Sequence, residues 1–275
     1  MNASSDNDLP VGIFDSGVGG LTVLKAIQAR LPAENLIYLG DTARLPYGTK
    51  SPRSIERYAT QATEKLRERG MKMLVVACNT ASAVALQALR EQMRPLPVIG
   101  VIEPGAAAAV SARPGGSHLV LATEATVRLG AYRAAIAALD PAATVREQAC
   151  ELLVALAEEG WTSGEIASAS IRRYLEEAGG HETQADSIIL GCTHFPLLKS
   201  AIRAEVPDDV QIVDSATTTA AVVADALAAN DMLRHAEREG GLRLLATDGA
   251  QRFALVGGRF LGKTLTAGDI ELCDL

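Results

Sequence analysis

Cysteine is scarce in this sequence and is never closely paired. The four cysteines, at positions 78, 150, 192 and 273 of the 275-residue chain, include no C-x-x-C spacing. That spacing is typical of structural zinc sites and dithiol redox centres, so the sequence predicts neither a metal site nor such a centre. A buried free cysteine usually packs as a small apolar side chain, and only its local context can indicate a further role.

Long apolar runs and an excess of basic charge are also missing. No apolar stretch approaches the length of a bilayer span, and residues 1–8 carry acids where a signal peptide carries basic residues. The formal net charge is −7, which argues against nucleic acid and anionic membranes as general partners. We therefore expect a cytoplasmic protein that binds neither nucleic acid nor membrane.

The glycine-rich stretch after the first predicted strand lacks residues that nucleotide-binding loops need. Residues 11–14 form a short apolar run, followed by Asp15-Ser16-Gly17-Val18-Gly19-Gly20 and then by helical periodicity. No Gly-Lys-Ser/Thr follows, so a P-loop is excluded. A dinucleotide fingerprint is the strongest rival interpretation, with Asp41 near the place of a ribose-binding acid. It is weakened because the third glycine is missing and because Asp15 would face the pyrophosphate.

Apolar runs alternate with helical segments along most of the chain. Further runs lie at residues 36–40, 73–77, 98–102, 118–122 and 187–191, and most of them precede a helix. Continuous apolar strands between helices are typical of parallel sheets covered on both faces, which predicts an α/β fold. Residues 73–80 and 187–194 also resemble each other. We therefore expect two similar lobes, each a mainly parallel sheet flanked by helices, with the active site in the cleft between them.

The short connections of this fold class suggest where the lobes begin and end. We expect lobe one to comprise residues 10–102 plus 213–275, lobe two to comprise residues 103–212, and residues 1–9 to form a flexible tail. The chain then crosses between the lobes near Glu103 and near Asp214. A strand candidate at residues 242–246 helps to complete lobe one.

A cysteine followed by polar residues stands at the end of one predicted strand in each lobe. Ligands of parallel α/β sheets bind beyond the carboxyl ends of the strands, where helix N-termini offer backbone N–H groups. Cys78 and Cys192 stand at such ends. Nearby dipoles or cations lower the pKa of a thiol from about 8.5 toward roughly 3.5–7.5, so we expect each thiol to be a credible base. Two sulfurs about 7 Å apart across a cleft can remove a proton from one face of a carbon and return one to the other face.

Four motifs carry a resemblance to a known family. They are Asp15-Ser16-Gly17-Val18-Gly19-Gly20, Asp41-Thr42-Ala43-Arg44-Leu45-Pro46-Tyr47-Gly48, Ala77-Cys78-Asn79-Thr80-Ala81-Ser82 and Leu190-Gly191-Cys192-Thr193-His194-Phe195-Pro196-Leu197-Leu198. From about residue 11 to residue 216 the chain resembles the glutamate racemases of the aspartate/glutamate racemase superfamily. The resemblance implies interconversion of L- and D-glutamate without pyridoxal phosphate, other cofactors or metal. It makes Cys78 the base toward D-glutamate and Cys192 the base toward L-glutamate.

The resemblance also implies supporting roles and a biological setting. Asp15 would assist Cys78, His194 would assist Cys192, and Glu158 would partner His194. The residues implied to hold the substrate are Asp15, Ser16, Pro46, Tyr47, Gly48, Asn79, Thr80, Thr123, Thr126, Thr193 and His194. D-Glutamate would supply peptidoglycan synthesis, and homodimers occur in this family.

Several alternatives stay open. Two family prolines are replaced by Glu151 and Ala155, which makes the placement of Glu158 a point for the structure to test. Asp15 is equally suited to capping the first helix. An aspartate racemase would share the cysteine pair and prefer another substrate. A non-catalytic protein would clasp a small acid between the lobes without exchanging its proton.

Overall fold

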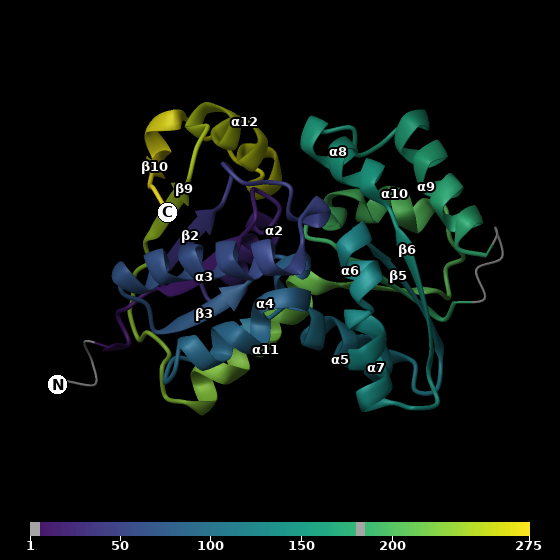
Figure 1. Cartoon of the computed structure of the whole chain (residues 1–275), viewed down its shortest axis with the longest axis horizontal. Helices are drawn as coiled ribbons and strands as arrows, with labels where there is room; N and C mark the ends of the chain where they lie inside the picture. The colour runs from purple at the N-terminus through teal and green to yellow at the C-terminus, as the bar shows by residue number, and fades with distance from the viewer. Residues whose placement is uncertain (1–5, 180–184) are drawn as a thin grey trace.

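The chain folds into two lobes that lie side by side, each built on a sheet with helices packed against it (Figure 1). The computed structural model describes residues 6–179 and 185–275. The strands are β1 (Val11–Asp15), β2 (Leu36–Gly40), β3 (Met73–Val76), β4 (Val98–Gly100), β5 (Ser117–Ala122), β6 (Thr144–Ala149), β7 (Ser187–Gly191), β8 (Gln211–Asp214), β9 (Leu242–Ala246) and β10 (Ile270–Leu272).

The helices connect these strands and cover the sheets. They are α2 (Leu21–Arg30), α3 (Pro52–Glu68), α4 (Asn79–Gln92), α5 (Ile102–Ala112), α6 (Glu124–Leu129), α7 (Ala131–Leu139), α8 (Glu151–Glu159), α9 (Glu165–Glu177), α10 (Lys199–Ala204), α11 (Ser215–Ala229) and α12 (Ala250–Leu261), with short 3-10 turns η1 (Tyr47–Thr49), η2 (Phe195–Leu198) and η3 (Ala267–Asp269). In the described part of the chain, no helix combines the length and apolar character that a membrane span requires.

The sheet of lobe one is parallel, with its described strands in the order β10-β9-β2-β1-β3-β4. Neighbouring residues of β1 enter different cores. Ile13 packs into a core that includes Leu24 of α2, and Phe14 packs into one that includes Leu89 of α4. Both faces of the sheet are therefore covered, which explains why its central strands are mostly apolar.

Lobe two repeats this plan on a smaller scale. Its described strands are parallel, in the order β6-β5-β7-β8. Leu119 and Val120 of β5 again point into different cores, and the second of these contains Tyr132 of α7. The predicted fold class, two mainly parallel sheets flanked by helices, is confirmed.

The predicted strands match best where the strand is central. The predictions at residues 36–40, 187–191 and 242–246 coincide with β2, β7 and β9. The prediction at residues 98–102 is too long, because β4 ends at Gly100 and Ile102 already begins α5. β6 was not predicted, because this edge strand carries polar, partly exposed residues.

The ends of the predicted lobes need adjustment. β8 pairs with β7, so the sheet of lobe two continues to Asp214, beyond the expected boundary at residues 212–213. Residues 1–5 of the expected flexible tail lie outside the described residues. Within the rest of that tail, the Asn7 side chain donates to the Asp231 carbonyl at 3.1 Å and the Asp8 carbonyl accepts from Asn35 at 2.7 Å.

A buried ion pair and its hydrogen bonds tie four segments of the chain together. Lys72 Nζ lies 2.5 Å from Glu34 Oε2, and the two side chains are only 3% and 2% exposed. The same ammonium group donates to the carbonyl oxygens of Asn7 at 2.7 Å and Met232 at 2.8 Å. Since a buried charge is costly unless it is paired, these contacts make Lys72 and Glu34 interdependent.

Candidate active site

Loops from both lobes meet at one cavity. Lobe one contributes the loops after β1 and β3 and the turn η1, and lobe two contributes the loops after β5 and β7 together with α8. The predicted site residues that line it are Ser16, Pro46, Tyr47, Gly48, Cys78, Asn79, Thr80, Thr123, Glu158, Cys192, Thr193 and His194. The structure thus brings one thiol from each lobe to the wall of the same cavity.

The size of the cavity and the packing of the glycine stretch argue against dinucleotide binding. The cavity has a volume of about 70 Å³, far below the roughly 300–1,000 Å³ of pockets for drug-sized ligands. A Cβ atom on Gly19 would overlap Thr193 Oγ1 and lie 2.5 Å from His194 Nδ1. Thr22 Oγ1 of the same segment donates to the Thr193 carbonyl at 2.9 Å. This part of the glycine stretch therefore serves the close approach of the two lobes.

Cys78 forms the N-cap of α4 on the lobe-one side of the cavity. Its sulfur accepts from the Ala81 N–H at 3.4 Å and donates to Ser16 Oγ at 3.4 Å. Burial, followed by the negative charge of Asp15, raises the pKa of the Cys78 thiol to about 12. The expected lowering of the pKa is wrong for this cysteine, because burial and a neighbouring carboxylate outweigh the helix N-terminus and the hydrogen bonds to sulfur.

Asp15 is buried and does not line the cavity. Its Oδ2 accepts from the Gly17 N–H at 2.9 Å and from Tyr38 Oη at 3.4 Å, while its Oδ1 has no hydrogen-bond partner among the described residues. It does not cap α2, whose N-cap is Gly20. Asp15 therefore acts on Cys78 through space, by its charge.

Replacement of Asp15 by asparagine should make Cys78 more reactive. Asp15→Asn keeps an oxygen that accepts from the Gly17 N–H and removes the negative charge that raises the Cys78 pKa. The Cys78 pKa should therefore fall, and the thiolate fraction of Cys78 should be larger than in the wild type at neutral pH. The measurement is the rate of alkylation of Cys78 between pH 7 and 9, followed by peptide mass spectrometry. Cys273 in the same sample is the control, because Asp15 is not among the charges that act on it. An unchanged or slower rate at Cys78 would contradict the electrostatic role of Asp15.

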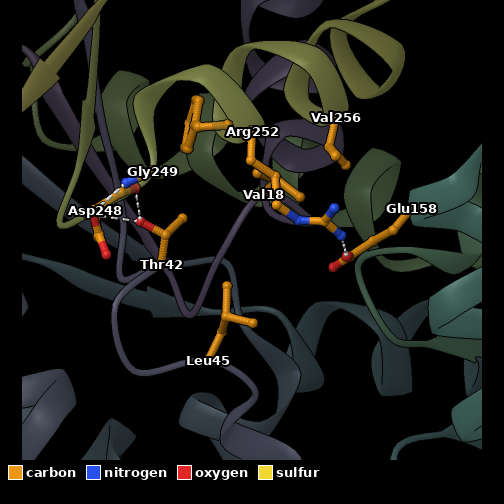
Figure 2. A pocket seen from close by; sticks show the side chains of 9 residues that line it. Val18, Thr42, Leu45, Glu158, Asp248, Gly249, Arg252 and Val256 are labelled. Atoms are coloured by element: carbon orange, nitrogen blue, oxygen red, sulfur yellow. Dashed lines mark hydrogen bonds and ion pairs between the residues drawn. The ribbon is translucent and has the colours of Figure 1, made fainter. Parts of the chain in front are cut away.

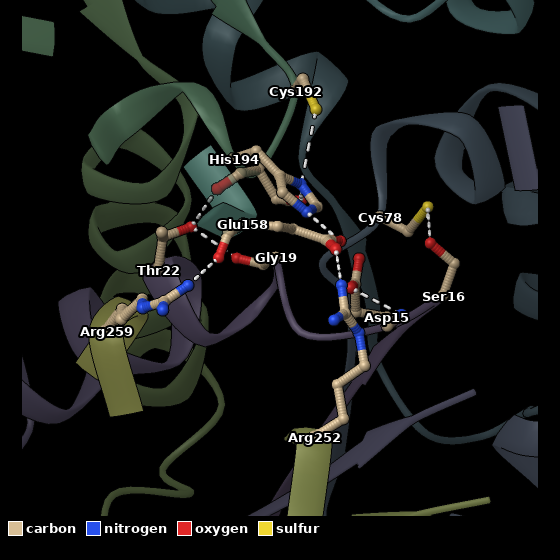
Figure 3. Close-up of polar contacts among 12 residues, drawn as sticks. Asp15, Ser16, Gly19, Thr22, Cys78, Glu158, Cys192, His194, Arg252 and Arg259 are labelled. Atoms are coloured by element: carbon tan, nitrogen blue, oxygen red, sulfur yellow. Dashed lines mark hydrogen bonds and ion pairs between the residues drawn. The ribbon is translucent and has the colours of Figure 1, made fainter. Parts of the chain in front are cut away.

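Cys192 has a different neighbourhood, a chain of polar contacts that runs from Cys192 through His194 and Glu158 to Arg252 and that we call the relay (Figure 3). Its Sγ lies 3.8 Å from His194 Nδ1, and His194 Nε2 lies 3.2 Å from Glu158 Oε1. The other carboxylate oxygen of Glu158 accepts from Arg252 Nη2 at 3.1 Å. Glu158 thus lies beside His194 as the resemblance implies, despite the replaced prolines.

His194 and Glu158 are both charged at neutral pH. Burial lowers the pKa of His194, but the hydrogen bonds with Cys192 and Glu158 and the nearby negative charges outweigh burial and raise it to about 10. The hydrogen bond from His194 holds the pKa of Glu158 below its usual value, and Arg252 adds to this effect. A protonated His194 therefore offers a proton donor to the Cys192 sulfur.

Polar side chains from both lobes complete the wall. Asn79 is buried, its Oδ1 accepts from Tyr132 Oη at 2.8 Å, and its Nδ2 has no partner among the described residues. Thr80 Oγ1 lies 3.0 Å from Thr123 Oγ1, which lies 3.1 Å from Thr126 Oγ1. Thr126 is fully buried and does not line the cavity, so it contacts the hydroxyl groups that do.

The Tyr47 hydroxyl is committed to another partner. It donates to Asp41 Oδ2 at 2.6 Å, and the same oxygen accepts from Arg44 Nε at 2.7 Å. Burial and the Asp41 charge raise the pKa of Tyr47. Any contact of Tyr47 with a small ligand therefore falls to its ring or to the backbone of η1, and Asp41 orders this loop.

Three lining residues and one relay residue were not predicted. Gly17, Leu45 and Val154 line the cavity. The sequence offered a reason to include all three, because Gly17 and Leu45 stand within the quoted motifs and Val154 stands one helical turn before Glu158. Arg252 carries no local signal, because it lies far along the chain from every motif.

A second cavity, which we call the outer cavity, borders the first. Figure 2 shows side chains that line it. It has a volume of about 230 Å³, and Leu45 and Glu158 line both cavities. Arg252 and Phe253 of α12 line the outer cavity only. Within the described residues, no group of three or more His, Cys, Asp or Glu side chains is arranged to hold a metal ion.

Fold and site together define a class: an α/β protein of two lobes that share a small cavity lined by one thiol from each lobe, the arrangement expected of an amino-acid racemase. The sequence profile of the Asp/Glu/Hydantoin racemase family matches residues 19–223. The chain belongs to this family and is an amino-acid racemase.

Individual relatives extend along nearly the whole chain. It is 48% identical to the glutamate racemase of Geobacter metallireducens, over 94% of each chain, and 44% identical to that of Neisseria meningitidis, over 97% of each chain. Among solved structures, a glutamate racemase isoform from Bacillus anthracis matches with a TM-score of 0.89 at 35% identity, covering 97% of this chain and 98% of that one. The Francisella tularensis glutamate racemase, solved in complex with D-glutamate, matches with a TM-score of 0.88 at 34% identity and the same coverage.

Proposed function

We propose that this protein is a glutamate racemase, which interconverts L- and D-glutamate by proton transfer at two cysteines without a cofactor. The observation that carries the proposal is the single cavity lined by Cys78 of one lobe and Cys192 of the other. The names of the relatives at 42–48% identity support glutamate as the substrate.

The proposed reaction moves one proton to and one proton from the α-carbon. Starting from L-glutamate, the Cys192 thiolate takes the α-proton, and the electron pair left on carbon takes a proton from the Cys78 thiol on the opposite face. One C–H bond breaks and another forms, so no redox step is needed. Cys192 is then a thiol and Cys78 a thiolate, which is the state that accepts D-glutamate.

The charges around the two thiols suit this exchange. Burial and Asp15 disfavour a thiolate at Cys78, and an α-ammonium group bound close to that sulfur offsets both effects. At Cys192 the protonated His194 is the hydrogen-bond donor to sulfur. The carbanionic transition state gains from fixed dipoles at the start of α4 and from the exclusion of water.

The rest of the wall suits a small dicarboxylate. Ser16, Thr80, Thr123 and Thr193 offer hydroxyl groups. Asn79 Nδ2, which has no partner among the residues that the structure describes, offers two N–H donors. We further propose that the D-glutamate formed supplies peptidoglycan synthesis in the cytoplasm, and that the enzyme forms a homodimer.

A circular dichroism assay tests the substrate assignment. L-Glutamate, D-glutamate, L-aspartate and D-aspartate are incubated separately with the protein. Because the enantiomers are equal in energy, the signal of either glutamate should decay to zero, and aspartate should react much more slowly. Faster decay of aspartate would identify an aspartate racemase. Binding of glutamate with no decay would identify a non-catalytic binding protein.

A further inference from the structure

Helix α12 of lobe one contacts Glu158 of lobe two at two points. Arg252 Nη2 donates to Glu158 Oε2 at 3.1 Å, and Arg259 Nη1 donates to the Glu158 backbone carbonyl. The two arginines lie on one helix, and Figure 3 shows both guanidinium groups directed at Glu158. The acid that contacts His194 is therefore held at its side chain and at its backbone by the opposite lobe.

The two oxygens of the Glu158 carboxylate serve opposite sides of the cleft. Oε1 lies 3.2 Å from His194 Nε2, and Oε2 lies 3.1 Å from Arg252. A carboxylate bridged in this way has little freedom to rotate, and the imidazole it contacts is fixed in turn. His194 is further fixed on its other side by Phe260, also of α12, whose ring centroid lies 5.1 Å away in an edge arrangement.

The Arg252 contact contributes little to the stability of the fold. Its side chain is 66% exposed and borders the outer cavity, while that of Glu158 is 23% exposed. Ion pairs at such exposure are weak because water competes for both charges. The contact instead constrains the position of the Glu158 carboxylate, because it forms only when α12 and α8 are close together.

We propose that Arg252 is a positioning residue that couples closure of the lobes to the orientation of His194 at Cys192. This inference rests on the proposed function. When the lobes separate, Glu158 loses Arg252 and is free to turn away from His194. When they close, the guanidinium returns the carboxylate to His194, which presents Nδ1 to the sulfur. The coupling acts on the Cys192 side of the reaction, since Cys78 contacts Ser16 and Ala81 instead.

Isotope effects distinguish a role of Arg252 in proton transfer at Cys192 from a role that affects both proton transfers equally. The equilibrium constant between enantiomers is one, so kcat/KM must be equal in both directions for every variant. Slower proton transfer at Cys192 makes that step more rate-limiting. The primary isotope effect on kcat/KM for 2-deuterio-L-glutamate should then rise, and that for 2-deuterio-D-glutamate should fall.

The experiment compares Arg252→Gln, Arg252→Lys and a matched control, Arg243→Gln. Arg243 pairs with Glu271 at 2.9 Å and lies near the start of β9, away from the carboxyl ends of the strands. We expect Arg252→Gln to lower kcat/KM by roughly ten- to hundredfold, the scale of a displaced catalytic group, with the opposed changes in the two isotope effects. Arg252→Lys, which keeps the cation, should recover part of the loss, and Arg243→Gln should behave as the wild type.

Two results would overturn the positioning role. One is an Arg252→Gln protein with wild-type turnover and unchanged isotope effects. The other is a loss of turnover that leaves the ratio of the two isotope effects unchanged or that Arg243→Gln reproduces. Failure of the wild-type protein to racemise glutamate in the same assay would instead overturn the proposed function.

Discussion

Replacing either Cys78 or Cys192 by alanine should abolish racemisation of glutamate, with a loss of at least roughly 10²–10⁴-fold, the usual contribution of a general acid or base. Each thiol serves one face of the α-carbon in the proposed reaction, and the neighbouring groups differ too much for one to replace the other. Cys78 has the Asp15 charge near it, and Cys192 has His194.

The two variants should fail in different ways. Cys78→Ala keeps the base for L-glutamate and should still exchange the α-proton of that enantiomer with solvent. Cys192→Ala should exchange only D-glutamate. The measurement is proton NMR in D₂O with each enantiomer, beside Cys273→Ala, whose thiol lies just after β10 and does not line the cavity. Wild-type turnover by either alanine variant, or the same exchange pattern in both, would contradict the assignment.

Loss of the Lys72 ammonium group should strongly lower the stability of the fold. Lys72→Met leaves Glu34 as an unpaired buried charge, which should lower the free energy of unfolding by about 3–5 kcal/mol. Urea unfolding measures the difference. The control is Lys65→Met, because the pair of Lys65 with Glu68 is exposed and should contribute about 0–1 kcal/mol.

A double variant separates the charge from the packing. In Lys72→Met with Glu34→Met, no buried charge remains, and most of the lost free energy should return. An unchanged unfolding midpoint in Lys72→Met would show that Glu34 is not an obligate partner of Lys72. A double variant that is less stable than Lys72→Met would show that the pair stabilises by its own attraction.

The sequence allowed prediction of the central strands, but not of the polar edge strands of lobe two. β2 and β7 lie between neighbouring strands, and all their residues are buried and nearly all are apolar, so their continuous runs were visible. β6 and β8 lie at the edges of their sheet and carry polar residues such as Arg146 and Gln211. Residue periodicity and hydrophobicity do not separate such strands from loops, because an edge strand has a neighbouring strand on one side only and keeps polar, partly exposed residues.

Site prediction followed the same logic. Ser16, Cys78, Thr123 and Cys192 were found because they follow strand ends, and strand ends of parallel sheets meet. Arg252 was missed because only the folded chain brings α12 to α8. The raised pKa of Cys78 was missed for a related reason: the helix N-terminus is local in sequence, whereas burial and the approach of Asp15 are not.

The most direct test of the central claim is the fate of deuterium in D₂O. Wild-type protein is given L-glutamate or, separately, D-glutamate, and the reaction is stopped at low conversion. Two opposed thiols predict that the product enantiomer carries deuterium at the α-carbon while the recovered substrate carries almost none, in both directions. Product that keeps the substrate's own hydrogen, or substrate and product labelled equally, would contradict a reaction with one cysteine on each face.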